Sequence, residues 1–158
     1  MLEENTLASK TQHSKTIVNS PEKREWFDTI PGERMAIHVQ SSAVGGNLAI
    51  METVAVPGCG SPLHFHRESE IFHILEGTMT FMCGGEKREA GLGTTIVVPP
   101  GVHHAWANLS PSQVRMLVVV TPGGIENLFP QANGLSPLDL VELVESYGTR
   151  IVGPPILG

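Results

Sequence analysis

The sequence of 158 residues predicts an all-β domain, either a barrel or a two-sheet jelly roll, followed by a short C-terminal helix. Short β-like runs alternate with turn residues from about residue 34 onward. The chain also has 17 Gly and 12 Pro residues, which favour many tight turns. Eight or more short strands at this spacing are typical of barrels and jelly rolls rather than of helical bundles.

The expected elements follow one another from a polar N-terminal segment. Residues 1–30 lack hydrophobic periodicity, so we expect a tail, or an arm that packs against a neighbouring subunit. Residues 31–124 form the expected barrel, in which glycine pairs and a Pro-Pro-Gly sequence mark turns. The expected strands cover residues 35–40, 47–56, 71–75, 78–83, 86–90, 94–98, 105–108 and 114–121, with turns at Gly45-Gly46, 57–62, Gly84-Gly85 and Pro99-Pro100-Gly101.

The remaining residues, 125–158, form a C-terminal segment with a helix at about 137–147. Apolar residues recur there at the spacing of one helix face, and we expect this face to cover the outside of a sheet. Ser136 is a suitable N-cap and Gly148 a suitable residue just beyond the helix. Pro154-Pro155 is expected to end regular structure. The apolar face consists of Leu140, Leu143, Val144 and Tyr147.

The charge balance excludes some classes of partner. Ten Lys and Arg against 16 Asp and Glu give a net charge of -6, which argues against nucleic acids and anionic membranes as partners. The sequence has neither an apolar run of membrane-span length nor the pattern of a signal peptide, so we expect a cytoplasmic protein. In that compartment Cys59 and Cys83 are expected to be reduced, with Cys59 a buried thiol.

Four of the seven histidines lie in two short segments. His64 and His66 are two residues apart, so in a strand both imidazoles point to the same face. Glu70 can add a carboxylate from the next strand, and His104 a third nitrogen from another. The alternative is that these are strand histidines satisfied by hydrogen bonds. Glu70 and His73 also have the spacing of a di-iron helical motif, but the β-rich surroundings argue against a helix there.

Two spaced motifs resemble those of the cupin superfamily. The resemblance implies a double-stranded β-helix, a jelly-roll barrel that holds one divalent metal: Fe, Mn, Ni, Co or Zn. It also implies that His64, His66, Glu70 and His104 are the ligands. The first motif is Gly58, five residues, His64-Phe65-His66, three residues, Glu70, six residues and Gly77. The second is Gly93, five residues, Pro99-Pro100-Gly101, two residues, His104, three residues and Asn108.

The chain further resembles small single-domain cupins described as quercetin-dioxygenase-like. This resemblance implies that Glu70 also acts as a base on a substrate hydroxyl. Strand parity places Phe72 and Ile74 on the face of Glu70. It likewise places Trp106 and Asn108 on the face of His104. All four are candidate substrate-binding residues, and for the apolar ones plain core packing is the alternative.

The sequence therefore favours a metal-dependent oxygenase that acts on a small aromatic or enolisable compound. A different metal enzyme on the same scaffold, an isomerase or a polyketide cyclase, is the second hypothesis. A binding module that senses or stores a small molecule or metal is the third, because fold alone does not define function. The family resemblance also implies a homodimer.

Overall fold

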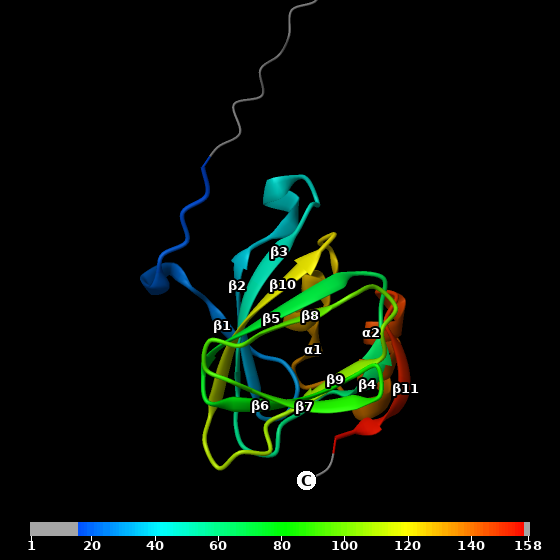
Figure 1. Ribbon diagram of the computed structural model, residues 1–158. Helices are drawn as coiled ribbons and strands as arrows, with labels where there is room; N and C mark the ends of the chain where they lie inside the picture. The colour runs from blue at the N-terminus through cyan, green and yellow to red at the C-terminus, as the bar shows by residue number, and fades with distance from the viewer. Residues whose placement is uncertain (1–15, 157–158) are drawn as a thin grey trace, which may run out of the picture.

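The computed structural model describes residues 16–156 and contains two antiparallel β-sheets that face each other (Figure 1). The six-stranded sheet has the order β1-β2-β3-β10-β5-β8, and the five-stranded sheet has the order β11-β4-β9-β6-β7. No helix of the described part is long and apolar enough to cross a membrane. The strands are β1 (Trp26–Asp28), β2 (Glu33–Val39), β3 (Ala49–Ala55), β4 (Pro62–Phe65), β5 (Ser69–Glu76), β6 (Thr78–Cys83), β7 (Glu86–Gly91), β8 (Thr95–Val98), β9 (His104–Ala107), β10 (Val114–Thr121) and β11 (Arg150–Pro155).

Strand β10 explains how the sequence builds the core between the sheets. Its side chains alternate between buried and half-buried positions along the strand, as expected of a strand with one face on the core. Val114, Met116, Val118 and Val120 point inward and join one hydrophobic cluster with residues of both sheets. The all-β jelly roll expected from the sequence is therefore confirmed.

The Gly84-Gly85 hairpin is also confirmed. Cys83 pairs with Glu86 across a two-residue turn, and the two glycines have φ angles of 58° and 85°. These positive φ angles are easily adopted only by glycine. Cys83 is half-buried and Cys59 is buried, and both are free thiols. Burial raises the pKa of Cys59 to about 12, so this thiol is unreactive at neutral pH.

Two of the edge strands, β1 and β11, differ from the expectation. β1 lies within the segment expected to be a tail, and β11 continues through Pro154 and Pro155, where we expect regular structure to end. Both are edge strands, and proline is tolerated at an edge because one side of the strand needs no ladder partner. A three-residue strand such as β1 is too short to produce a hydrophobic period.

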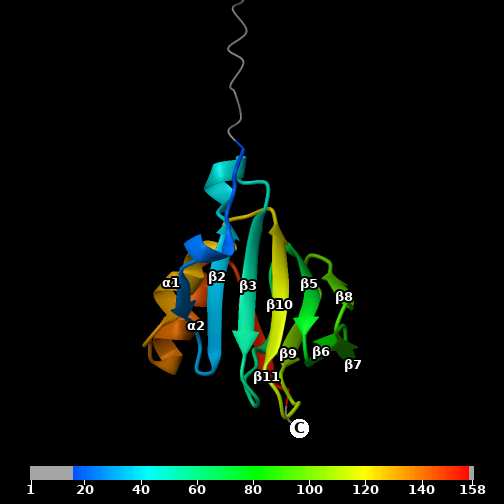
Figure 2. The same ribbon diagram turned by 90° about the vertical axis from the view of Figure 1, so that its left-hand side faces the viewer.

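Two helices connect the open edges of the sheets. Helix α1 (Phe129–Ala132) contacts β1, and helix α2 (Pro137–Ser146) contacts β11, so both helices lie at one side of the barrel (Figure 2). The Ser136 hydroxyl accepts a hydrogen bond from the Asp139 backbone N–H, which confirms the expected N-cap. Instead of covering the outside of a sheet, α2 directs Leu140 and Val144 into a cavity between the sheets.

Candidate metal centre

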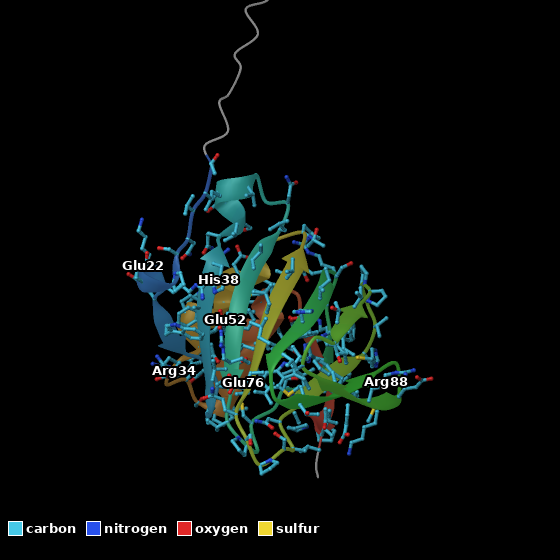
Figure 3. All side chains as sticks on the ribbon, turned by 60° about the vertical axis from the view of Figure 1, so that its left-hand side comes forward. Glu22, Arg34, His38, Glu52, Glu76 and Arg88 are labelled. Atoms are coloured by element: carbon cyan, nitrogen blue, oxygen red, sulfur yellow. The ribbon has the colours of Figure 1, made fainter. Side chains whose placement is uncertain are left out.

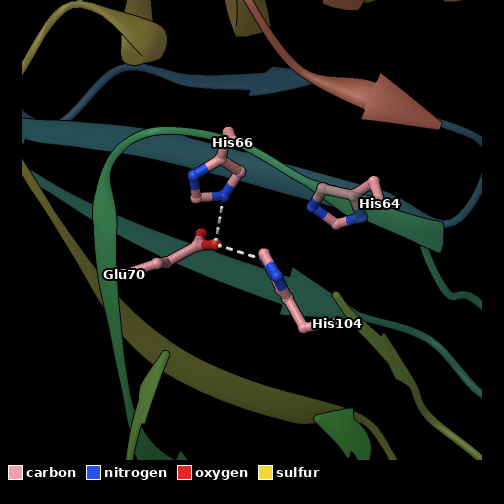
Figure 4. A group of neighbouring side chains, drawn as sticks. All are labelled: His64, His66, Glu70 and His104. Atoms are coloured by element: carbon pink, nitrogen blue, oxygen red, sulfur yellow. Dashed lines mark hydrogen bonds and ion pairs between the residues drawn. The ribbon is translucent and has the colours of Figure 1, made fainter. Parts of the chain in front are cut away.

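Three imidazoles and one carboxylate converge inside the barrel (Figure 4). His64 lies in β4 and His66 directly follows that strand, Glu70 lies in β5 and His104 begins β9. One potential ligand atom from each of the four residues lies within 4.8 Å of the others. Three segments of the chain thus contribute four donors to one small volume, as a mononuclear metal centre requires.

Backbone carbonyls orient two of the imidazoles. His64 Nδ1 lies 2.8 Å from the Pro62 carbonyl oxygen, and His104 Nδ1 lies 2.8 Å from the Val102 carbonyl oxygen. A carbonyl only accepts hydrogen bonds, so Nδ1 carries the proton in both rings. In the neutral imidazole of His64, Nε2 then keeps its lone pair for a metal.

A second carboxylate supports His66. Glu68 is 2% exposed, and its Oε2 lies 3.4 Å from His66 Nδ1. The other Glu68 oxygen accepts a hydrogen bond from Arg67 Nε at 3.0 Å. Neither Glu68 Oε2 nor His66 Nδ1 has a hydrogen-bond partner, so Glu68 acts on the ring through its charge, which increases the basicity of a ligating histidine. Glu68 was not predicted from the sequence, although it lies two residues from Glu70 in the first motif.

Glu70 joins the cluster by two contacts from one oxygen. Its Oε2 lies 3.1 Å from Nε2 of both His66 and His104. Burial alone would raise the pKa of Glu70. The hydrogen bonds with His104 and His66 outweigh burial and hold the pKa of this carboxyl well below its usual range. Burial, with the nearby His104, lowers the pKa of His64 to about 4. At neutral pH the cluster therefore offers an ionised carboxylate and a neutral His64.

This donor set fits a divalent transition metal. Lone pairs of imidazole nitrogens and a carboxylate oxygen repel one another unless protons or a cation lie between them. Three nitrogens and one oxygen suit Fe, Mn, Ni, Co or Zn, so the donor types do not select one metal. A metal bound by four protein atoms retains room for further ligands where its preferred coordination number is higher than four.

The cluster opens on a cavity of about 250 Å³. Phe72 and Trp106 line this cavity, whereas Ile74 is fully buried in the core and is absent from the lining. Asn108 does not line it either, because its amide bonds the Ala55 and Ser112 carbonyl oxygens and orders a loop. The apolar lining includes Phe72, Trp106, Met116, Val118, Leu128 and Val144.

Two neighbouring histidines lie outside the cluster. His73 bonds the Thr95 hydroxyl at 2.8 Å, and the exposed His103 stacks on Phe65 with ring centroids 5.0 Å apart. His73 lies on the face of β5 opposite Glu70, in agreement with the two-residue period of a strand, and His103 lies just before β9. These residues serve as controls for the cluster.

The fold and the site together define a small jelly-roll barrel with an internal cluster of three histidines and one glutamate. Residues 51–120 match the family model of the cupin domain. This stretch of the chain is therefore similar to a cupin domain, and the two sheets have the fold of a double-stranded β-helix. A comparison with the curated proteins finds no match.

Solved structures with the same fold include proteins of different activities. KdgF from Halomonas sp. has a TM-score of 0.64 at 19% identity, covering 72% of this chain and 99% of its own. The polyketide cyclase RemF from Streptomyces resistomycificus has a TM-score of 0.59 at 20% identity, and the match covers 69% of this chain and 80% of RemF. A predicted oxalate decarboxylase from Thermotoga maritima has a TM-score of 0.60 at 22% identity, and the match covers 68% of this chain and 100% of that protein. These identities support the fold alone.

We expect Glu68→Ala to lower the affinity for metal about 10- to 100-fold while the barrel stays folded, because His66 loses the carboxylate behind its ring. Metal titration of the purified protein measures this change, and circular dichroism checks the fold. Glu86→Ala, an exposed acid on β7, is the matched control and should bind metal as the unaltered chain does. Equal affinities in both variants would contradict a supporting role for Glu68.

Proposed function

We propose that this protein is a metal-dependent enzyme that oxidises a small aromatic or enolisable compound with molecular oxygen. The observation that carries the proposal is the four-donor cluster at the wall of a largely apolar cavity. An apolar pocket with a few converging polar groups is the usual form of a small-molecule site. The net charge of -6 is compatible with a phenolic substrate, because binding would rest on the metal and the apolar walls.

Each residue of the site has a distinct task in this proposal. His64, His66, Glu70 and His104 would hold the metal, which when bound stabilises negative charge on a substrate oxygen. Glu70, ionised at neutral pH, accepts the proton of a substrate hydroxyl. Phe72 and Trp106 pack against a planar ring and exclude water from the reacting end.

A non-oxidative metal enzyme, such as an isomerase or a cyclase, is the second candidate. It is favoured by Glu33, a further buried carboxyl at the cavity wall, because two acids in one pocket suit proton transfer. A binding module remains the third candidate, and it requires ligand binding without turnover. The expected homodimer and cytoplasmic location stay predictions.

Oxygen uptake distinguishes the candidates. With flavonols as substrates and Fe, Mn, Ni or Co in the site, we expect oxygen consumption in step with loss of substrate. Product formed equally well without oxygen would favour the isomerase or cyclase. An absence of turnover with flavonols, catechols and enediols under all four metals would contradict the oxygenase.

A further inference from the structure

Glu33 is a buried acid that lacks the usual electrostatic compensation. It begins β2, is 6% exposed and belongs to none of the ion pairs among residues 16–156. Buried acids are normally paired with a cation or kept neutral. Its partners are instead the hydroxyls of Thr29 and Thr53.

Glu52 shows how the same sheet pairs a buried acid with cations. Glu52 is 2% exposed, but Arg24 approaches one oxygen at 3.2 Å and Arg115 the other at 2.6 Å. His38 lies 3.1 Å from the same carboxylate, on the neighbouring strand β2 (Figure 3). The arginines present at Glu52 have no counterpart at Glu33 in the described chain.

The hydrogen bonds around Glu33 accommodate a neutral carboxylic acid. Thr53 Oγ1 lies 2.7 Å from Glu33 Oε1 and 3.2 Å from the Arg34 carbonyl oxygen. When both threonine hydroxyls donate to the Glu33 oxygens, the single proton of a neutral Glu33 is not taken up by them and can be donated to a ligand. The pKa of Glu33 is raised. Burial raises it most, the hydrogen bonds with the two threonine hydroxyls lower it, and the negative charge of Glu70 raises it further.

These polar groups face the cavity already described. Thr29, Glu33 and Thr53 all line it, together with His64, His66 and Glu70 of the cluster. Its lining contains no Lys or Arg, so an anionic group of a ligand would find no cation at this end. The chemistry instead suits a neutral oxygen that accepts a hydrogen bond.

We propose that Glu33, supported by Thr29 and Thr53, is a ligand-binding residue that donates a hydrogen bond to a neutral carbonyl or ether oxygen of the molecule in the cavity. The substrate of this enzyme would then carry an uncharged acceptor oxygen besides the oxygen that reaches the metal cluster. That role in turnover rests on the proposed function. The hydrogen bond itself does not, so metal-free protein tests it separately.

The first experiment detects the proton on Glu33. Infrared spectra of metal-free protein at neutral pH should contain the carbonyl stretch of a protonated carboxylic acid, and Glu33→Gln should lack it. Acetophenone, an aromatic ketone without a metal-binding hydroxyl, should shift this band. Absence of the band, or a band that acetophenone leaves unchanged, would overturn the proposal.

The second experiment measures affinity with a matched pair of probes. Acetophenone and isopropylbenzene have similar shapes, but only the ketone accepts a hydrogen bond. We expect Glu33→Leu to weaken acetophenone binding about five- to tenfold and to leave isopropylbenzene binding unchanged or stronger. Glu33→Gln keeps a donor and should retain the affinity for acetophenone. If Glu33→Leu changes stability but affects both probes alike, the role of Glu33 is structural and the proposal fails.

Discussion

The double substitution His64→Ala and His66→Ala is expected to abolish stoichiometric metal binding and to leave the barrel folded. It removes two of the four donors and leaves only Glu70 and His104 near the site. The fold should survive because the hydrophobic cluster between the sheets includes neither histidine. Elemental analysis of protein purified without chelators or added metal measures the loss, and circular dichroism measures the fold.

The matched control is the pair His73→Ala and His103→Ala. Both residues are near the cluster in sequence, but they contact Thr95 and Phe65 instead. This control should retain as much metal as the unaltered chain. Stoichiometric metal in the His64 and His66 variant, or none in the unaltered protein, would refute the assigned ligand set.

Regular strands were the part of the fold that the sequence predicted best. The expected ranges 78–83 and 114–121 coincide with β6 and β10, because each has a clear strand pattern with turn residues next to it. By contrast, β1, α1 and β11 are short or contain proline. Their formation depends on pairing or packing with distant segments, which a local pattern does not reveal.

The metal-ligand cluster also combines a feature that a local pattern predicts with one that depends on pairing between distant segments. Strand parity brings His64 to the side of the ligands, and the direct pairing of His64 with His104 depends on sheet register. Glu33 was missed although it shares the inner face of β2 with Met35 by the same parity. Acids are usually exposed, so their burial is visible only once the opposing sheet is in place.

Asn108 shows where parity is insufficient. It follows the last residue of β9, and its side chain turns to the backbone of Ala55 and Ser112. Beyond the end of a strand the alternation no longer determines the direction of a side chain. The second motif therefore contains two residues with different tasks: His104 is a candidate metal ligand inside the barrel, and Asn108 orders the adjoining loop.

Glu70→Gln is expected to separate metal binding from turnover. Glutamine has nearly the same volume and keeps a carbonyl oxygen, and the three imidazoles remain, so metal binding should weaken without disappearing. The amide has no basic carboxylate to accept the substrate proton. At saturating metal we therefore expect turnover to fall by about 100-fold or more, measured as the initial rate of flavonol consumption.

Glu76→Gln is the control on the same strand. Glu76 is exposed at the end of β5, where its nearest charged partner is Arg115 at 4.0 Å, so this variant should keep both metal and turnover. Glu70→Gln protein that contains one metal per chain and turns over within a few-fold of the unaltered protein would rule out Glu70 as the base. Its carboxylate would then serve only as a ligand, and the proton acceptor would have to be sought elsewhere in the cavity.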